Sequence, residues 1–187
     1  MSDARSPLGL TPSPTPLLGA LLAGGQARRF GADKALALLD GKRLIDRAIA
    51  ALAAQCDAVV ICGRDYGGMR SLADRPRAGL GPLGGLNAAL HLARAEGFAG
   101  VLTSACDIPV LPSDLRHRLV PLPATVRGQP LVAIWPSALA DALDAHLAQA
   151  TDFSMRHWIA QSGAQRIAFV EPVPNINTPA DLAALSR

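Results

Sequence analysis

Short apolar runs alternate with longer segments of helical periodicity along most of this 187-residue chain. Five runs have the length and aliphatic composition of buried strands, and they span residues 17–22, 58–62, 98–103, 130–135 and 166–170. Apolar side chains recur at helical spacing in residues 43–55, 83–97, 137–150 and 154–161, and a last helix is expected to open at Thr178. This alternation predicts a single three-layer α/β domain, in which helices cover both faces of a mainly parallel sheet.

The composition fits one globular domain, since half of the residues are hydrophobic and 18% are charged. The formal net charge is only +3, and the Lys and Arg residues are scattered along the chain. This distribution favours a small anionic ligand over nucleic acid. Three cysteines without a Cys-x-x-Cys pair predict neither a disulfide framework nor a zinc site, and they favour the reducing cytoplasm. Residues 1–16 lack an apolar run, so we expect a disordered tail, with no signal peptide or membrane span, before a domain at 17–187.

The first apolar run leads into a loop rich in glycine and cations, which reads LAGGQARRFGADK at residues 22–34. Gly24 and Gly25 allow backbone N–H groups to approach phosphate oxygens, while Arg28, Arg29 and Lys34 supply cations. The pattern is neither a Walker A loop nor Gly-x-Gly-x-x-Gly. It therefore predicts a triphosphate site at the carboxyl end of a strand, with an ordinary glycine-rich turn and solvated arginines as the alternative.

A carboxylate follows the strand expected at 98–103, because that run ends in Ser104-Ala105-Cys106-Asp107-Ile108-Pro109. One Asp facing a triphosphate is enough for Mg²⁺, which takes one or two protein carboxylates and completes its shell with water and phosphate. We therefore expect Asp107 to hold Mg²⁺, and the alternative is that it caps the turn before Pro109. Cys106 is interpreted as a small buried residue rather than a nucleophile.

A second glycine-rich stretch, DRPRAGLGPLGGL at residues 74–86, opens the helix expected at 83–97. Its glycines suit close approach to a base and ribose, and Asp74 could accept hydrogen bonds there. A flexible connector with a helix start at Pro82 is the alternative. The four histidines share no metal-ligand spacing and are expected at the surface, whereas Trp135 and Trp158 are expected to pack in the interior.

Four segments together resemble the molybdenum cofactor guanylyltransferase family. They are the loop from Leu22 to Lys34, Gly81-Pro82-Leu83-Gly84-Gly85, Cys106-Asp107-Ile108-Pro109, and Asn175-Ile176-Asn177-Thr178-Pro179. The first and third also occur in sugar-phosphate and isoprenoid nucleotidyltransferases, so the second and fourth narrow the resemblance to this family. It implies a Rossmann-like domain of nucleotidyltransferase type that covers the chain from residue 17 almost to its end.

The resemblance also implies roles for individual residues. The nucleotide would contact Leu22, Ala23, Gly24 and Lys34. The residue types of the loop add Gly25 to these contacts, and Arg28 with Lys34 to the groups that neutralise phosphate charge. Asp74 and Gly85 would lie near the ribose and base, Asp107 would bind Mg²⁺, and Asn175 and Asn177 would face the pterin. Two departures are Phe30, where Met is usual, and Cys62-Gly63-Arg64, where relatives often carry an Asn that touches the nucleotide.

The implied reaction is transfer of GMP from GTP to the terminal phosphate of molybdopterin, with release of pyrophosphate. The acceptor phosphate is already ionised at neutral pH, so no protein base is required. Molybdenum insertion or molybdoenzyme delivery proteins are candidate partners. The alternatives are a molybdopterin cytidylyltransferase, a sugar-phosphate nucleotidyltransferase, or a delivery protein that binds nucleotide without turnover.

Overall fold

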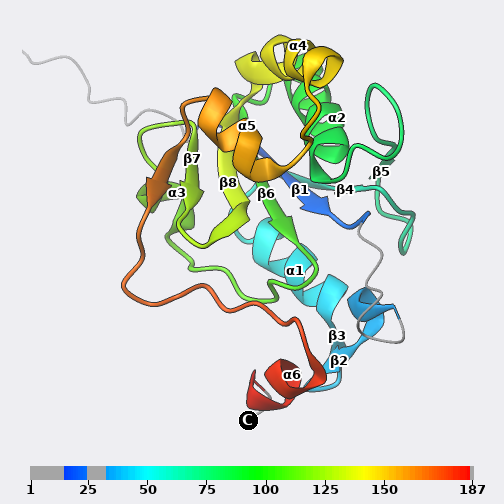
Figure 1. Ribbon diagram of the computed structural model, residues 1–187. Coiled ribbons are helices and arrows are strands. Elements are labelled where there is room, and N and C mark those ends of the chain that lie inside the picture. Colours follow the sequence, from blue (N-terminus) through cyan, green and yellow to red (C-terminus); the bar gives the residue numbers. More distant parts are fainter. Residues whose placement is uncertain (1–14, 25–32, 186–187) are drawn as a thin grey trace, which may run out of the picture.

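A computed structural model describes residues 15–24 and 33–185 of the chain (Figure 1). Its main feature is a seven-stranded sheet with the strand order β5-β4-β1-β6-β8-β7-β9. The strands are β1 (Leu17–Leu22), β4 (Ala58–Cys62), β5 (Ser71–Leu72), β6 (Gly100–Ala105), β7 (Ala124–Val126), β8 (Gln129–Pro136) and β9 (Gln165–Ile167).

The sheet is mainly parallel, as the sequence predicts. Strand β1 pairs in parallel with β4 and β6, β4 with β5, and β7 with β9. Strand β8 is antiparallel to both of its neighbours, β6 and β7. The carboxyl ends of β1, β4 and β6 therefore meet at one edge, which is where ligands bind in open sheets of this kind.

Helices cover both faces of the sheet and complete three layers (Figure 1). Helices α2 (Pro82–Ala95), α4 (Ala140–Gln149) and α5 (Met155–Gln161) share one apolar core with the sheet. Helices α1 (Leu44–Ala53) and α3 (Leu115–Arg118) share a second core on the opposite face. Within the described residues, no helix is both long enough and apolar enough to cross a bilayer.

Strand β1 lies at the centre of the fold because all six of its residues are buried. Leu18 and Ala20 face the core of α2, whereas Leu17 and Leu21 face the core of α1. Gly19 admits close packing, since a Cβ at that position would lie 3.2 Å from Cys56 Sγ. A strand covered on both faces is continuously apolar, which is why its bounds could be predicted from the sequence.

Several elements differ from the sequence prediction. Strand β6 is displaced by two residues, from 98–103 to Gly100–Ala105, and β9 covers only Gln165–Ile167. The helix expected at 137–150 begins as a 3-10 turn, η2 (Ser137–Leu139). Of the tail expected at residues 1–16, residues 1–14 lie outside the described part of the chain, and the Pro16 carbonyl accepts a hydrogen bond from Ala99 N at 2.9 Å.

Short elements were missed because two or three residues carry no periodicity. These are η1 (Lys34–Leu36), the hairpin of β2 (Leu38–Leu39) and β3 (Lys42–Arg43), and strands β5 and β7. The hairpin has one recognisable signal, the turn dipeptide Asp40-Gly41, whose φ angles are +49° and +75°.

The C-terminal helix α6 (Pro179–Leu185) begins where the sequence predicts. Thr178 Oγ1 accepts a hydrogen bond from Asp181 N at 3.2 Å, and Asp181 Oδ2 accepts from Thr178 N at 2.8 Å, which forms a capping box. Leu182 and Leu185 pack with buried Ile176 beside the hairpin at the lower edge of Figure 1. The chain before α6 is thereby held next to the segment that contains Lys34.

Candidate active site

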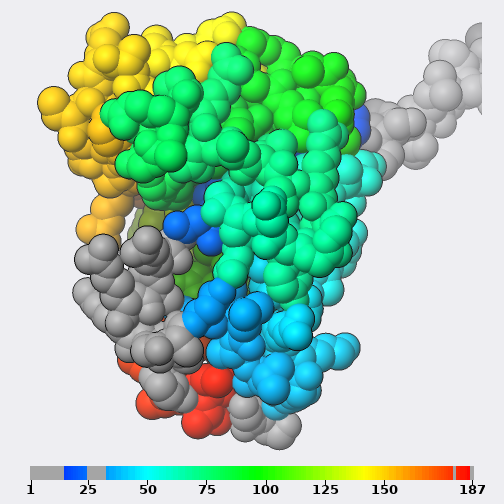
Figure 2. All heavy atoms as spheres, turned by 90° about the vertical axis from the view of Figure 1, so that its right-hand side faces the viewer, coloured from blue at the N-terminus to red at the C-terminus, as the bar shows by residue number. Residues whose placement is uncertain are grey.

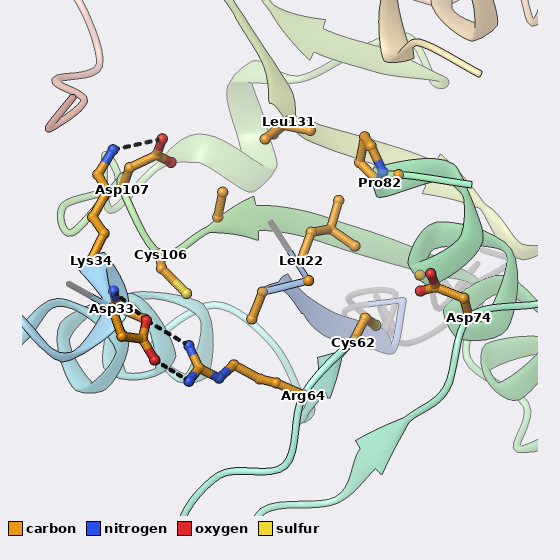
Figure 3. A pocket seen from close by; sticks show the side chains of 16 residues that line it. Leu22, Asp33, Lys34, Cys62, Arg64, Asp74, Pro82, Cys106, Asp107 and Leu131 are labelled. Carbon is orange, nitrogen blue, oxygen red and sulfur yellow. Dashed lines mark hydrogen bonds and ion pairs between the residues drawn. The ribbon is translucent and has the colours of Figure 1, made fainter. Parts of the chain in front are cut away.

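A cleft of about 320 Å³ opens at the carboxyl ends of β1, β4 and β6. Figure 2 shows the end of β1, in dark blue, at the surface between the green helical layer and the lighter blue segment after Asp33. The lining of the cleft combines apolar side chains such as Leu22 and Leu131 with three carboxylates, one lysine and one arginine (Figure 3). A cleft of this size and mixed polarity suits a small charged ligand.

The backbone after β1 is held close to the backbone after β4. Ala23 N donates to the Cys62 carbonyl at 2.9 Å. A Cβ at Gly63, whose φ is +84°, would lie 2.7 Å from Gly24 Cα. Glycine is therefore required at Gly63 for both its backbone conformation and this crossing. Leu22, Ala23 and Gly24 line the cleft as expected of a nucleotide-binding loop.

Lys34 joins three segments that are distant in the sequence. Its Nζ lies 3.3 Å from Asp107 Oδ2 and 3.4 Å from Asn177 Oδ1. Asn177 Nδ2 donates in turn to Asn175 Oδ1 at 2.7 Å, and Ile176 N donates to the Asp107 carbonyl at 2.8 Å. The structure thus brings together the lysine, the aspartate and the two asparagines that the sequence singled out.

Asp107 fits the requirement of a Mg²⁺ site beside phosphates. Its carboxylate follows β6, lines the cleft and keeps 26% of its side chain exposed while Lys34 contacts one oxygen. Mg²⁺ uses one or two protein carboxylates when substrate phosphates supply further ligands. Among the described residues, the only group of three or more clustered metal-ligand side chains lies elsewhere, at His91, Asp141 and Asp144.

Asp74 lines the cleft from the loop before α2, as expected. Arg75 N donates to the Gly84 carbonyl at 3.1 Å, which ties this loop to the first turn of the helix. A Cβ at Gly84 would lie 2.8 Å from Asp74 Cγ, and one at Gly85 would lie 2.7 Å from Cys62 Cβ. Gly85 therefore allows α2 to approach the end of β4, and Gly84 allows it to approach Asp74. The sequence analysis did not consider this packing role.

Arg64 is a site residue to which the sequence analysis gave no role, since it noted Arg64 only as part of a departure from the family pattern. Its guanidinium forms a two-point contact with the Asp33 carboxylate, with Nη1 to Oδ1 at 3.1 Å and Nη2 on Oδ2. This hydrogen bond from Arg64 lowers the pKa of Asp33 below its ordinary value. The available signal was position, because Arg64 follows β4 at the same sheet edge that carries Asp107.

The cysteines of the cleft are not nucleophiles. Burial raises the pKa of the Cys62 and Cys106 thiols to about 12, so both remain protonated at neutral pH. Cys106 is thus the small, unreactive residue that the sequence suggested. Gly25, Arg28, Arg29 and Phe30 lie outside the described residues, and their assigned roles stay predictions.

The expectation for the histidines is wrong for two of the four. His91 Nε2 lies 2.8 Å from Asp144 Oδ2, and His146 stacks on His157, so His91 and His146 are half-buried between helices. Asp141 and Asp144 are also engaged by Arg94 and by Asn87, each at 2.7 Å, which makes that cluster an ion-pair network. The tryptophans pack as expected, with Trp135 and Trp158 ring centroids 6.3 Å apart.

Residues 19–167 match the family model of the MobA-like NTP transferase domain. The chain is 37% identical to a molybdenum cofactor guanylyltransferase of Acidiphilium cryptum, over 92% of this chain and 95% of that protein. It is 39% identical to the Rhodobacter capsulatus protein of the same name, over 89% and 93% of the two chains.

Solved structures share the fold at lower identity. Molybdopterin-guanine dinucleotide biosynthesis protein A from Archaeoglobus fulgidus has a TM-score of 0.66 at 22% identity, over 90% of this chain and 96% of that one. A 2-C-methyl-D-erythritol 4-phosphate cytidylyltransferase from Thermus thermophilus has a TM-score of 0.59 at 16% identity, over 89% and 96%. The likeness of both to the present fold agrees with a three-layer nucleotidyltransferase domain.

Proposed function

Since this chain belongs to the MobA-like NTP transferase domain family and, within it, to the molybdenum cofactor guanylyltransferases, we propose that it transfers GMP from GTP to the phosphate of molybdenum-molybdopterin. The products are the guanine dinucleotide form of the cofactor and pyrophosphate. The protein is accordingly a nucleotidyltransferase enzyme. Molybdenum-molybdopterin is a substrate in this reaction rather than a resident cofactor.

The observation that carries the proposal is the position of Lys34 between Asp107 and Asn177. One cation, one carboxylate and one amide from three separate segments converge at the end of the cleft, and each has a chemical task in phosphate transfer. Lys34 can donate to phosphate oxygens, Asp107 can hold a metal ion, and Asn177 can bind a polar acceptor.

The chemistry needs no proton acceptor from the protein. An ionised oxygen of the acceptor phosphate attacks the α-phosphorus of GTP and forms the new P–O bond. The bond from the α-phosphorus to the bridging oxygen breaks, and pyrophosphate leaves with the electron pair. When bound at Asp107, Mg²⁺ supplies charge neutralisation for the phosphates. Lys34 stabilises the same developing charge and orients the chain of phosphates.

The nucleotide lies along the ends of β1 and β4 in this proposal. Leu22, Ala23 and Gly24 offer backbone groups, and Gly25 and Arg28 continue the phosphate-binding loop. Asp74 accepts hydrogen bonds from the ribose or base at the opposite end of the cleft. Gly85 keeps the wall beneath the base flat, because it carries no side chain.

The acceptor lies on the side of Asn175 and Asn177, which α6 holds against the hairpin. We place the reaction in the cytoplasm, where three free cysteines would stay reduced. Molybdenum insertion and molybdoenzyme delivery proteins are the partners we propose, because the former would supply the acceptor and the latter would take up the product.

The test is pyrophosphate release by the purified protein with Mg²⁺ and molybdopterin, measured with GTP and with CTP. We expect release with GTP that depends on the acceptor, and formation of the guanine dinucleotide. Equal or faster turnover with CTP would replace the guanylyl assignment by a cytidylyl one. Turnover with a sugar phosphate but not with molybdopterin would show that the proposed acceptor is wrong and that the enzyme is a sugar-phosphate nucleotidyltransferase.

A further inference from the structure

We propose that Arg64 is a positioning residue for nucleotide binding, which acts by holding Asp33 as a neutral ion pair beside Lys34. The inference rests on the proposed function, since it assumes that the cleft takes a nucleoside triphosphate. It assigns a role to a side chain that lies at the cleft but has none of the catalytic tasks above.

The first step of the argument is the geometry of the pair. Both carboxylate oxygens of Asp33 accept hydrogen bonds from Arg64, whose Nη1 lies 3.1 Å from Oδ1 (Figure 3). Arg64 Nε is buried and has no hydrogen-bond partner among the described residues. Asp33 therefore engages one N–H of each Nη, and the Nε donor is buried, so three of the five guanidinium donors are directed away from a phosphate in the cleft.

The second step links Asp33 to Lys34. Asp33 is the N-cap of η1, where its Oδ1 accepts a hydrogen bond from Ala35 N at 3.1 Å. The turn consists of three residues, and Leu36 N donates to the Asp33 carbonyl at 3.0 Å. A turn this short depends on its cap for orientation. Fixing Asp33 with a planar two-point contact thus fixes the backbone from which Lys34 extends to Asp107.

The third step is electrostatic. The Asp33 side chain is 41% exposed and lines the same cleft as Lys34. Without Arg64, the Asp33 carboxylate would be a negative charge with no paired cation beside the proposed site of a polyanion. Repulsion between these like charges would oppose nucleotide binding. Arg64 removes that repulsion by pairing with the Asp33 carboxylate.

The alternative is that Arg64 leaves Asp33 and binds phosphate itself. The two roles make opposite predictions for a variant that removes the charge of Asp33. If Arg64 positions Asp33, neutral Asn at position 33 should compensate for the loss of Arg64. If Arg64 is itself a phosphate ligand, the same neutral residue should rescue little in its absence, because the lost contact is not restored.

The experiment is a double-mutant cycle on the full-length protein with Arg64→Ala, Asp33→Asn and their combination. Calorimetry measures the affinities of GTP, CTP and inorganic tripolyphosphate, and steady-state kinetics measures KM and kcat. We expect Arg64→Ala to weaken GTP binding about tenfold and to raise the KM for GTP, while kcat stays within about twofold of the wild-type value. Adding Asp33→Asn should recover at least about threefold of that affinity. Arg70→Ala is the matched control, because Arg70 pairs with Glu96 and does not line the cleft.

Three results would overturn the inference. They are wild-type affinity in Arg64→Ala, a double variant no better than Arg64→Ala, and a fall in kcat of Arg64→Ala with KM unchanged. Failure of the proposed function has a different signature, namely a wild type that binds CTP and tripolyphosphate but not GTP. In that case the same double-mutant cycle, measured with CTP as the ligand, still decides the role of Arg64.

Discussion

At the scale of single residues, the cleft is an arrangement of opposite charges that a substrate must partly replace. Lys34 contacts Asp107 and Arg64 contacts Asp33, so two ion pairs stand side by side at one end of the cleft. A triphosphate with its metal ion competes for Lys34 and Asp107 but leaves Asp33 paired. Substitutions in the two pairs should therefore have different kinetic consequences.

Asp107→Asn should reduce turnover by a factor of about a hundred or more, because the amide cannot neutralise or hold a metal ion as a carboxylate does. The fold should persist, since the side chain is 26% exposed and the Asp107 backbone contact to Ile176 is retained. Kinetics at saturating Mg²⁺ and a circular-dichroism melt measure the two quantities. Asp114→Asn is the control, and unchanged turnover in Asp107→Asn would refute the metal assignment.

Lys34→Ala should weaken GTP binding by roughly 1.5–3 kcal/mol, which is the contribution of a hydrogen bond to a charged group. The loss should extend to inorganic tripolyphosphate, because Lys34 interacts with phosphate rather than with the base. Calorimetry with both ligands measures this, with Lys42→Ala as the exposed-lysine control. Equal affinities in Lys34→Ala and the wild type would leave Lys34 with a purely structural role.

The residue chemistry could be predicted where a polar group follows a buried strand. Asp107 and Lys34 satisfy that condition, and the resemblance placed Asn177 with them. The pairing of Arg64 with Asp33 could not be predicted, because it depends on how the fold places the segment after β4 beside the start of η1. No local pattern encodes a contact across 31 residues of loop, helix and strand.

At the scale of secondary-structure elements, helix α2 controls the width of the cleft. Two glycines in its first turn let the helix approach β4 and Asp74, because even a Cβ atom at either position would lie too close to its neighbours. Sequence analysis interpreted these glycines as exposed backbone for a base, because a glycine-rich helix start is typical of ligand loops. The distances to Cys62 and Asp74 show that they also serve helix packing.

Gly85→Ala should therefore destabilise the fold by about 1–3 kcal/mol, as expected for overpacking, since its Cβ would meet Cys62 Cβ at 2.7 Å. Displacement of α2 should also weaken the binding of GTP, CTP and tripolyphosphate to a similar extent. Denaturant unfolding and calorimetry measure the two effects, with Ala95→Ser at the exposed end of α2 as the control. Selective loss of GTP without loss of stability would instead favour direct recognition of the base at Gly85.

Helices α4 and α5 meet through a histidine pair whose charge state should influence stability. Burial, and then the neighbouring His157, lower the pKa of His146 below its ordinary value of 6.5. The unfolded chain therefore takes up the proton at a higher pH than the folded one, so protonation disfavours folding. Stability contributed by neutral His146 is present above pH 6.5 and is lost as the pH falls below it.

His146→Gln should flatten this dependence. Urea unfolding of the wild type at intervals from pH 7.5 to 5.5 should show a loss of stability that the variant shows to a smaller extent. Asp152 and His157, the other charged groups at this junction, are unchanged in the comparison. Exposed His117→Gln is the control, and parallel curves for wild type and His146→Gln would contradict the assignment.

At the scale of the whole molecule, the sequence could predict the layer order but not how the site is closed. Continuous apolar strands and periodic helices define three layers, because burial on both faces leaves a strong pattern. The C-terminal connection leaves no such pattern, yet it brings Asn177 to Lys34 across 143 residues. The capping box at Thr178 and buried Ile176 help to fix where this segment ends.

Removal of residues 175–187 should consequently separate nucleotide binding from transfer. The sheet and both main cores lie outside this segment, so the protein should still fold, with a melting temperature lower by roughly 5–10 °C from the lost packing of Ile176 and α6. GTP affinity should stay within about threefold of the wild type, since one amide contact to Lys34 is lost and Asp107 remains. Formation of the dinucleotide should fall by more than a hundredfold, because the amides proposed to bind the acceptor are gone.

The full-length Asn175→Ala/Asn177→Ala variant tests the amides alone, and it should show the same loss of transfer with wild-type stability. Normal transfer by that variant would assign the segment a structural role, and loss of GTP binding by the truncated protein would place the segment on the nucleotide side of the cleft.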